Sequence, residues 1–160
     1  MKILISACLL GENTRYNGIV KPVTDPRIIR WFSEGLLVSF CPEISGGLNV
    51  PRPPAEIING SGGSVWEGKA SVFNSQRKDV TRSFVLGAFM TLETCRKHNI
   101  KLAVLKDGSP SCGSSYIYDG SFSGKKISGM GITTSLLIRN GIMIVNENEL
   151  EMIGSDFLPI

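Results

Sequence analysis

The chain has 160 residues, of which 42% are hydrophobic and 19% are charged, so the composition excludes an intrinsically disordered protein and predicts one domain, 1–160, with a buried core. A net charge of +3, with 17 scattered basic residues, does not indicate a nucleic-acid-binding protein, although it allows a basic rim around an anionic ligand. No stretch has the length of a membrane span, and the first apolar run is too short for a signal peptide. We therefore expect a cytoplasmic protein whose four cysteines are thiols, metal ligands or catalysts before they are disulfides.

The first quarter of the chain predicts a strand, a helix and a second strand. Residues 2–6 and 36–40 are short apolar runs typical of buried strands. Residues 7–18 between them are predicted to form a loop, and Asp25 and Pro26 predict the start of a helix, as an N-cap followed by proline at the first helical position. The predicted apolar face of that helix consists of Ile28, Ile29, Trp31 and Phe32.

An irregular insertion is predicted over residues 42–75. Prolines and glycines exclude long regular structure from 42–54, and we expect this segment to wall the functional site. The sequence NGSGGS at 59–64 predicts a mobile loop or a small excursion, with short strands near 65–66 and 70–73.

The second half of the chain alternates helices and strands. Asp79 predicts the cap of a long helix over 80–98, in which Cys95 takes a core position and His98, the single histidine, lies at the surface. The later predicted elements are a buried strand over 102–105, a turn or hairpin over 115–129, a helix over 131–140, a strand over 142–145 and a terminal helix over 146–153. The whole pattern predicts an α/β fold with three layers: an open, mainly parallel sheet with helices on both faces.

Three of the four cysteines follow predicted strands. Cys8 comes after the first strand, Cys41 directly after the second, and Cys112 after a Gly-Ser-Pro-Ser turn that ends the strand over 102–105. The carboxyl ends of parallel strands meet at one edge of an open sheet, where ligands bind. We therefore expect these cysteines to lie close together.

The residues alone leave three interpretations of this cysteine set open. The thiols could be unrelated buried groups, because free cysteine is often buried. One could be a nucleophile, although such chemistry usually needs a histidine base, and His98 is predicted far from the site. Three converging thiolates also suit an iron–sulfur cluster, or zinc completed by a carboxylate or water.

Five motifs carry a resemblance to a known family. They are SACLLG at 6–11, RYNG at 15–18, CPE followed by GL and VPR within 41–52, DVT at 79–81 and LKDGSPSCG at 105–113. In this order they resemble the motifs of a bacterial domain family, formerly of unknown function, that includes the 2-thiouracil desulfurases and thiolated-nucleobase desulfidases. The resemblance covers most of the chain and is weakest over 61–76.

The resemblance implies a single iron–sulfur desulfurase-like domain with an oxygen-sensitive [4Fe-4S] cluster on Cys8, Cys41 and Cys112. The iron without a cysteine would capture the sulfur of a thiocarbonyl group. Asp107 and Gly108 depart from the family pattern, in which a basic residue often precedes SPSC. This departure bears on the substrate more than on the cluster.

The resemblance also implies roles for three residues near the cluster. Glu43 would be the acid/base, and Ser109 or Ser111 would hydrogen-bond the substrate. Near thiolates we expect the pKa of Glu43 to rise, whereas the alternative is an exposed loop carboxylate paired with Arg52. The candidate substrate-binding residues are Arg15, Tyr16 and Arg52.

The leading hypothesis is thus cluster-dependent removal of sulfur from a thiolated nucleobase or a similar small thiocarbonyl compound, with oxygen supplied by water. The rival is a zinc-binding or redox cysteine module without this activity. Action on thiolated tRNA would need a nucleic-acid surface that the scattered charge does not indicate. The sequence does not identify the acceptor of the sulfide, the oligomeric state or the role of 59–76.

Overall fold

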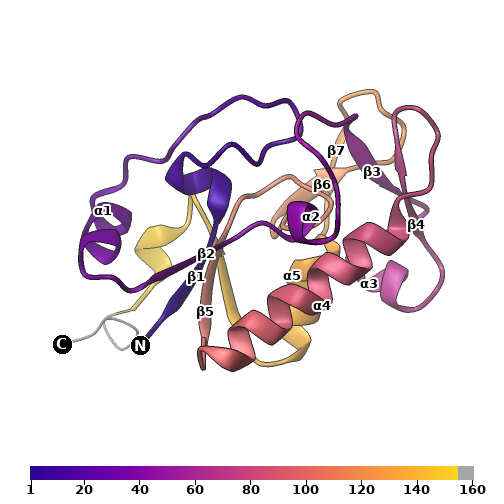
Figure 1. The fold of residues 1–160 in the computed structure, drawn as a ribbon. Coiled ribbons are helices and arrows are strands. Elements are labelled where there is room, and N and C mark those ends of the chain that lie inside the picture. Colours follow the sequence, from indigo (N-terminus) through magenta and orange to yellow (C-terminus); the bar gives the residue numbers. More distant parts are fainter. Residues whose placement is uncertain (155–160) are drawn as a thin grey trace.

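Four parallel strands form the central sheet of the computed structural model, which describes residues 1–154. In spatial order they are β2 (Leu37–Phe40), β1 (Ile3–Ser6), β5 (Leu102–Leu105) and β8 (Met143–Asn146). The register pairs Ser6 with Phe40 and Ile5 with Val104, so β1, β2 and β5 end at the same edge of the sheet (Figure 1). The predicted open parallel sheet is confirmed.

Helices cover both faces of this sheet: α1 (Pro26–Ser33) lies on one face, and α4 (Thr81–Lys97) and α5 (Ile132–Arg139) lie on the other (Figure 1). Successive residues of a strand point to opposite faces. Ile5 therefore packs with Trp31 of α1, whereas Leu4 packs with Cys95 of α4. The three predicted layers and the core position of Cys95 are confirmed.

The predicted insertion is a folded unit with a core of its own. It contains α2 (Pro42–Ser45), β3 (Ala55–Ile58), α3 (Gly62–Trp66) and β4 (Ser71–Asn74), and a later hairpin of β6 (Tyr116–Tyr118) and β7 (Lys126–Ser128) joins it. Ile57, Val72, Phe84 and Ile117 are buried together in this core. Burying each such side chain contributes about 1.5–3 kcal/mol, which is enough to order short elements.

The predicted strand near 65–66 is wrong, because these residues end α3. The N–H of Ser61 donates to Ser64 Oγ at 3.2 Å, a local bond that favours a helix start over an extended chain. The indole N–H of Trp66 then donates to the Ile132 carbonyl at 2.9 Å. Helix α3 is thereby fastened to α5.

Three further expectations need correction. Residues 7–10 form a 3-10 helix, η1 (Ala7–Leu10), inside the predicted loop. The predicted terminal helix is reduced to η2 (Leu150–Met152), because Asn146 belongs to β8 instead of capping a helix. In α1, Ile29 and Phe32 are 58% and 66% exposed, since the helix touches the sheet along a narrow face.

Within residues 1–154, no helix has the length and apolarity needed to cross a membrane.

Candidate metal centre and active site

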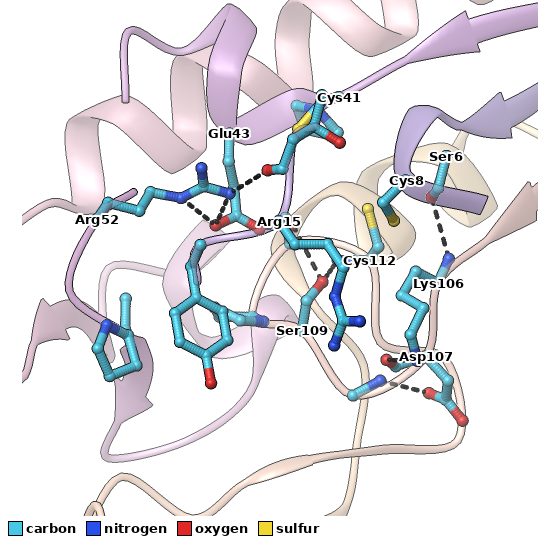
Figure 2. A pocket seen from close by; sticks show the side chains of 18 of the residues that line it. Ser6, Cys8, Arg15, Cys41, Glu43, Arg52, Lys106, Asp107, Ser109 and Cys112 are labelled. Atoms are coloured by element: carbon cyan, nitrogen blue, oxygen red, sulfur yellow. Dashed lines mark hydrogen bonds and ion pairs between the residues drawn. The ribbon is translucent and has the colours of Figure 1, made fainter. Parts of the chain in front are cut away.

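A cavity of about 370 Å³ opens at the carboxyl edge of the sheet, between it and the insertion. Figure 2 shows residues from both parts facing this space. All nine residues predicted from the sequence line it: Cys8, Arg15, Tyr16, Cys41, Glu43, Arg52, Ser109, Ser111 and Cys112.

Each candidate ligand cysteine is placed by a different strand. Cys8 lies in η1 after β1, Cys41 is the N-cap residue of α2 after β2, and Cys112 lies in the loop after β5. Because β1 pairs with both β2 and β5, the three loops start side by side. All three cysteines are free thiols that line the cavity, whereas Cys95 is buried on the face of α4 that packs against the sheet.

Burial controls the acidity of these thiols. It raises the pKa of Cys8 to about 11, and the nearby Cys41 adds to the effect. Burial also raises the pKa of Cys112 to about 12 against a hydrogen bond from Ser111, and it raises the pKa of Cys41 against the N–H of Ile44. The metal-free thiols are thus protonated near neutral pH, and metal binding as thiolates would release protons.

The spacing of potential ligands distinguishes a cluster from a single ion. Among residues 1–154, no three cysteine, histidine, aspartate or glutamate side chains are grouped tightly enough to hold one metal ion. A tetrahedral zinc site needs its sulfurs within about 4 Å of one another, since each Zn–S bond is about 2.3 Å. In a four-iron cluster each cysteine binds a different iron, so the sulfurs stand further apart. Three thiols that line one cavity without forming such a tight group fit a cluster.

Glu43 is held between Arg52 and the loop after β5. Its Oε1 accepts hydrogen bonds from Nε and Nη2 of Arg52, both at 3.2 Å, and its Oε2 accepts one from Ser111 Oγ at 2.8 Å. The two charged side chains are only 14% and 7% exposed. The alternative interpretation is therefore right about the ion pair with Arg52 and wrong about exposure, because the Glu43 carboxylate is nearly buried.

Close helix packing fixes the position of this carboxylate. Helix α2 lies against α4 so tightly that a Cβ on Gly87 would come within 1.9 Å of the Pro42 carbonyl oxygen. Any side chain at that position would push away the turn that carries Glu43 and follows Cys41.

Ser109 and Ser111 continue the polar network toward Cys112. Their hydroxyl oxygens are 3.2 Å apart, and Ser109 Oγ accepts the Cys112 N–H at 2.8 Å. The first N–H groups of α5 donate to the carbonyls of Pro110 and Ser111, both at 2.9 Å. The glycine-rich start of α5 thus has no free N–H groups there for an anion, and it braces the serine loop instead.

The two candidate substrate residues after β1 differ in placement. Figure 2 shows the Arg15 side chain extending into the cavity, where it is half-buried. Tyr16 is 43% exposed at the mouth, and its carbonyl accepts the Arg52 N–H at 2.8 Å. Arg15 therefore has its donors directed at the cavity, and Tyr16 lies near the opening.

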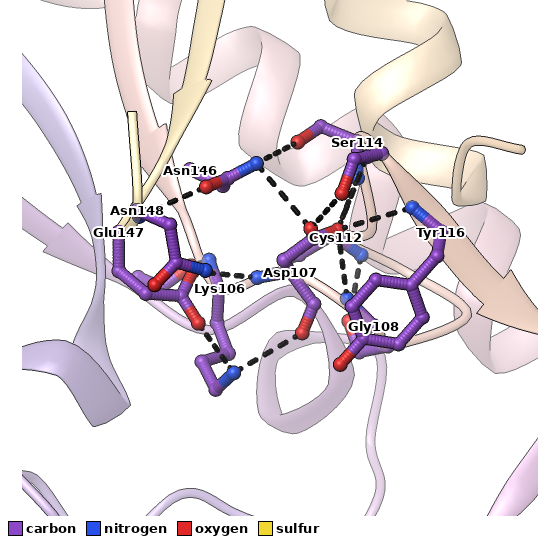
Figure 3. Close-up of polar contacts among 12 residues, drawn as sticks. Lys106, Asp107, Gly108, Cys112, Ser114, Tyr116, Asn146, Glu147 and Asn148 are labelled. Carbon is purple, nitrogen blue, oxygen red and sulfur yellow. Dashed lines mark hydrogen bonds and ion pairs between the residues drawn. The ribbon is translucent and has the colours of Figure 1, made fainter. Parts of the chain in front are cut away.

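Sequence reasoning missed several lining residues, above all Asp107, Lys106 and Tyr116. Burial raises the pKa of the Asp107 carboxyl, but the Ser115 hydroxyl and the N–H groups of Ser114, Ser115 and Gly108 lower it by more, so the net shift is downward. Lys106 Nζ pairs with the Glu147 carboxylate (Figure 3). The sequence did hold a signal for Asp107: Asp-Gly is a turn dipeptide, and an aspartate in a turn often accepts hydrogen bonds from nearby backbone N–H groups.

Comparison with known proteins places this geometry in a family. The model of the 2-thiouracil desulfurase family matches residues 3–149. The uncharacterized protein YbbK of Bacillus subtilis (strain 168) is 44% identical over 148 residues, which are 92% of this chain and 97% of that protein. A solved structure described as the [4Fe-4S]-dependent thiouracil desulfidase TudS superposes with a TM-score of 0.85 at 42% identity, covering 94% of this chain and 93% of that one. The chain that builds this three-cysteine cavity therefore belongs to the 2-thiouracil desulfurase family.

Proposed function

We propose that this protein removes sulfur from 2-thiouracil or a closely similar thiolated base. The overall reaction is hydrolytic: the thiocarbonyl compound and water give the carbonyl compound and hydrogen sulfide, with no net oxidation or reduction. The observation that carries the proposal is the convergence of three thiols and a hydrogen-bonded carboxylate on one cavity. Membership in the family and the likeness to TudS support it.

Cys8, Cys41 and Cys112 would hold a [4Fe-4S] cluster. Three protein ligands leave one iron open, and when bound the cluster supplies a soft Lewis acid for the thiocarbonyl sulfur. The three cysteines line the cavity itself, so a substrate in the cavity would face the open position.

Glu43 would take a proton from the attacking water. Its Oε1 is occupied by Arg52 and its Oε2 by Ser111, so the carboxylate is held in one orientation while Oε2 can exchange a proton with the hydroxyl. Ser111 in turn lies 3.2 Å from Ser109. The two serines would carry the proton onward or bind the substrate, and Arg15, Tyr16 and Arg52 would surround the base.

The test is a preparation made without oxygen. We expect brown protein that contains iron and acid-labile sulfide, converts 2-thiouracil to uracil and releases one sulfide per turnover. A colourless anaerobic preparation with one zinc ion per chain and no sulfide release would overturn the proposal. The sulfide acceptor can be sought only after this result.

The proposed substrate is a small thiolated base, and the proposed location is the cytoplasm. All four cysteines are free thiols, as expected in a reducing compartment. The cavity volume of about 370 Å³ is in the range of small-molecule sites. Thiolated tRNA is the competing substrate, and a side-by-side assay of the free base and the modified RNA decides between them.

A further inference from the structure

We infer that Tyr116 is a specificity-determining residue, whose hydroxyl donates a hydrogen bond to the second carbonyl of a thiolated pyrimidine. This inference rests on the proposed function and assigns a protein contact to the C4 carbonyl of the base. It predicts that the preferred substrate carries both a thiocarbonyl and an oxo group.

The β6–β7 hairpin forms an aromatic wall of the cavity. Tyr116 and Tyr118 are two residues apart on β6, so they share one face of the strand, and both line the cavity. Ile117 between them points the opposite way into the core of the insertion, where it is 1% exposed. The two tyrosine rings meet edge to face, with centroids 6.1 Å apart.

Two buried carboxylates hold this wall in place. Asp107 accepts the N–H groups of Ser114 and Ser115, at 2.9 and 3.1 Å, just before β6 (Figure 3). Glu56 accepts the N–H of Gly120, at 2.9 Å, just after it. Because both ends of the strand are tied to buried charges, the tyrosines are positioned before a substrate arrives.

Gly108 makes room for the Tyr116 hydroxyl. A Cβ built on Gly108 would lie 2.5 Å from the Tyr116 hydroxyl oxygen and 2.6 Å from Cζ of the ring. Gly108 also has a φ of +85°, which side-chain-bearing residues rarely adopt. The close contact shows that the phenol end rests on the turn that carries Ser109, and it places the hydroxyl within about 8 Å of the Ser109 Cα.

The Tyr116 hydroxyl is available to a ligand. Within residues 1–154 it makes no hydrogen bond to protein, and it is not among the fully buried atoms. The ring is held from another side by Lys126, whose Nζ lies 4.5 Å from the ring centroid. A phenol that is fixed in place and unpaired at a cavity wall fits a hydrogen-bond acceptor on the bound molecule.

The substrate geometry determines which acceptor this is. The thiocarbonyl must face the cysteines, and the water must be within reach of Glu43. Tyr116 comes from the hairpin, on the part of the cavity that the insertion builds. A planar base spans such a cavity, so with the thiocarbonyl at the cysteines the Tyr116 hydroxyl faces another part of the ring. In 2-thiouracil the ring atoms beyond the C2 thiocarbonyl and its two flanking nitrogens are C4, C5 and C6. The only hydrogen-bonding substituent on them is the C4 carbonyl oxygen, which accepts but does not donate.

The test crosses a protein change with a substrate change. Tyr116→Phe removes only the hydroxyl, and pyrimidine-2-thione keeps the thiocarbonyl but lacks the second carbonyl. For 2-thiouracil we expect Tyr116→Phe to lower kcat/KM three- to tenfold, the usual loss for one neutral hydrogen bond. For pyrimidine-2-thione we expect less than a twofold change. Tyr118→Phe is the control, because it removes a hydroxyl two residues along the same strand. Its effect on kcat/KM should be the same for the two substrates.

Product binding gives a readout independent of turnover. Tyr116→Phe should weaken the binding of uracil, measured by titration calorimetry, by the same three- to tenfold factor. Gly108→Ala, which displaces the phenol, should likewise lower kcat/KM more for 2-thiouracil than for pyrimidine-2-thione.

Either of two results overturns the inference while leaving the proposed function intact. One is an equal loss on both substrates, which means that Tyr116 supports the fold of the site. The other is wild-type kinetics and uracil binding in Tyr116→Phe. If instead the wild-type protein with a full complement of iron releases no sulfide from either substrate, the proposed function fails first.

Discussion

Two segments of this protein each follow a parallel strand, carry a candidate cluster ligand and line the same cavity, yet they are built differently. The loop after β5, residues 106–115, is buried or half-buried up to residue 114, and its carbonyls and N–H groups bond to α5 and to Asp107. The segment after β1 carries Cys8 in η1, and the loop that follows η1, residues 11–23, is mostly exposed and depends on a few bonds such as that from the Arg52 backbone N–H to the Tyr16 carbonyl. The first is suited to holding reacting groups still, and the second to admitting a substrate.

The largest effect should follow removal of a ligand from either segment. Cys8→Ser and Cys112→Ser should each lose the cluster entirely, although Cys8 precedes an exposed loop and Cys112 lies in a buried one, because a cluster with an open iron has no ligand to spare. Cys41→Ser should do the same. Iron and sulfide analysis of anaerobically purified protein measures this.

Cys95→Ser is the matched control, because this thiol lies in the core, on the face of α4 that packs against the sheet. It should keep full iron content and lose some stability. Equal iron loss from all four variants, each still folded, would contradict the three-ligand assignment.

The second largest effect should follow loss of the Glu43 carboxylate, which accepts a hydrogen bond from Ser111 in the loop after β5. Glu43→Gln keeps the shape of the side chain and removes the titrating group, so kcat should fall about a hundredfold or more, as is usual for a lost general acid/base. The variant should retain iron and bind a thiolated base. Wild-type sulfide release from an iron-replete Glu43→Gln protein would assign the proton transfer to a serine or water.

Loss of the Asp107 carboxylate should show that the loop after β5 contributes more to stability than the exposed loop. Asp107→Asn removes a charged acceptor of several hydrogen bonds and should lower the free energy of unfolding by about 3 kcal/mol. In the exposed loop, Asn17 Oδ1 accepts the Ile19 N–H at 3.0 Å, and Asn17→Ala should cost less than about 0.5 kcal/mol. Urea unfolding of the cluster-free proteins measures both. Similar values would contradict the difference in rigidity.

The same carboxylate should make the protein acid-sensitive. Hydrogen bonds hold the pKa of Asp107 below its usual value in the folded state, so the carboxylate contributes stability above the unfolded pKa of about 3.9. That contribution is lost as pH falls through the folded pKa. The stability advantage of wild type over Asp107→Asn should therefore be constant near pH 6 and shrink below about pH 4. A constant difference across this range would indicate that the carboxylate is not the source.

The smallest effect should come from the exposed loop. Arg15→Gln removes a guanidinium directed into the cavity, so KM for 2-thiouracil should rise about tenfold while kcat and the unfolding free energy change little. A fall in kcat with unchanged KM would instead assign Arg15 to the chemical step.

The sequence by itself determined the sheet and the address of the site. Short apolar runs ending in turn residues predicted β1, β2 and β5. In β1 and β5 the reason is burial on both faces, which needs apolar side chains throughout, whereas β2 at the edge of the sheet is half-buried. Parallel topology then required Cys8, Cys41 and Cys112 to meet at one edge, and the resemblance of their motifs added the roles of Glu43, Ser109 and Ser111.

Only the tertiary structure decided how these residues are supported. The Asn146 side chain donates to Asp107 Oδ2 at 3.3 Å, and the Gly108 turn meets Tyr116 of a separate hairpin. Both contacts join segments that are distant in sequence, so the local sequence pattern of either segment does not predict them. The strand expected at 65–66 is a helix for the same reason, since Trp66 finds its hydrogen-bond acceptor on α5. Local propensity is weak in short segments, and long-range partners decide their conformation.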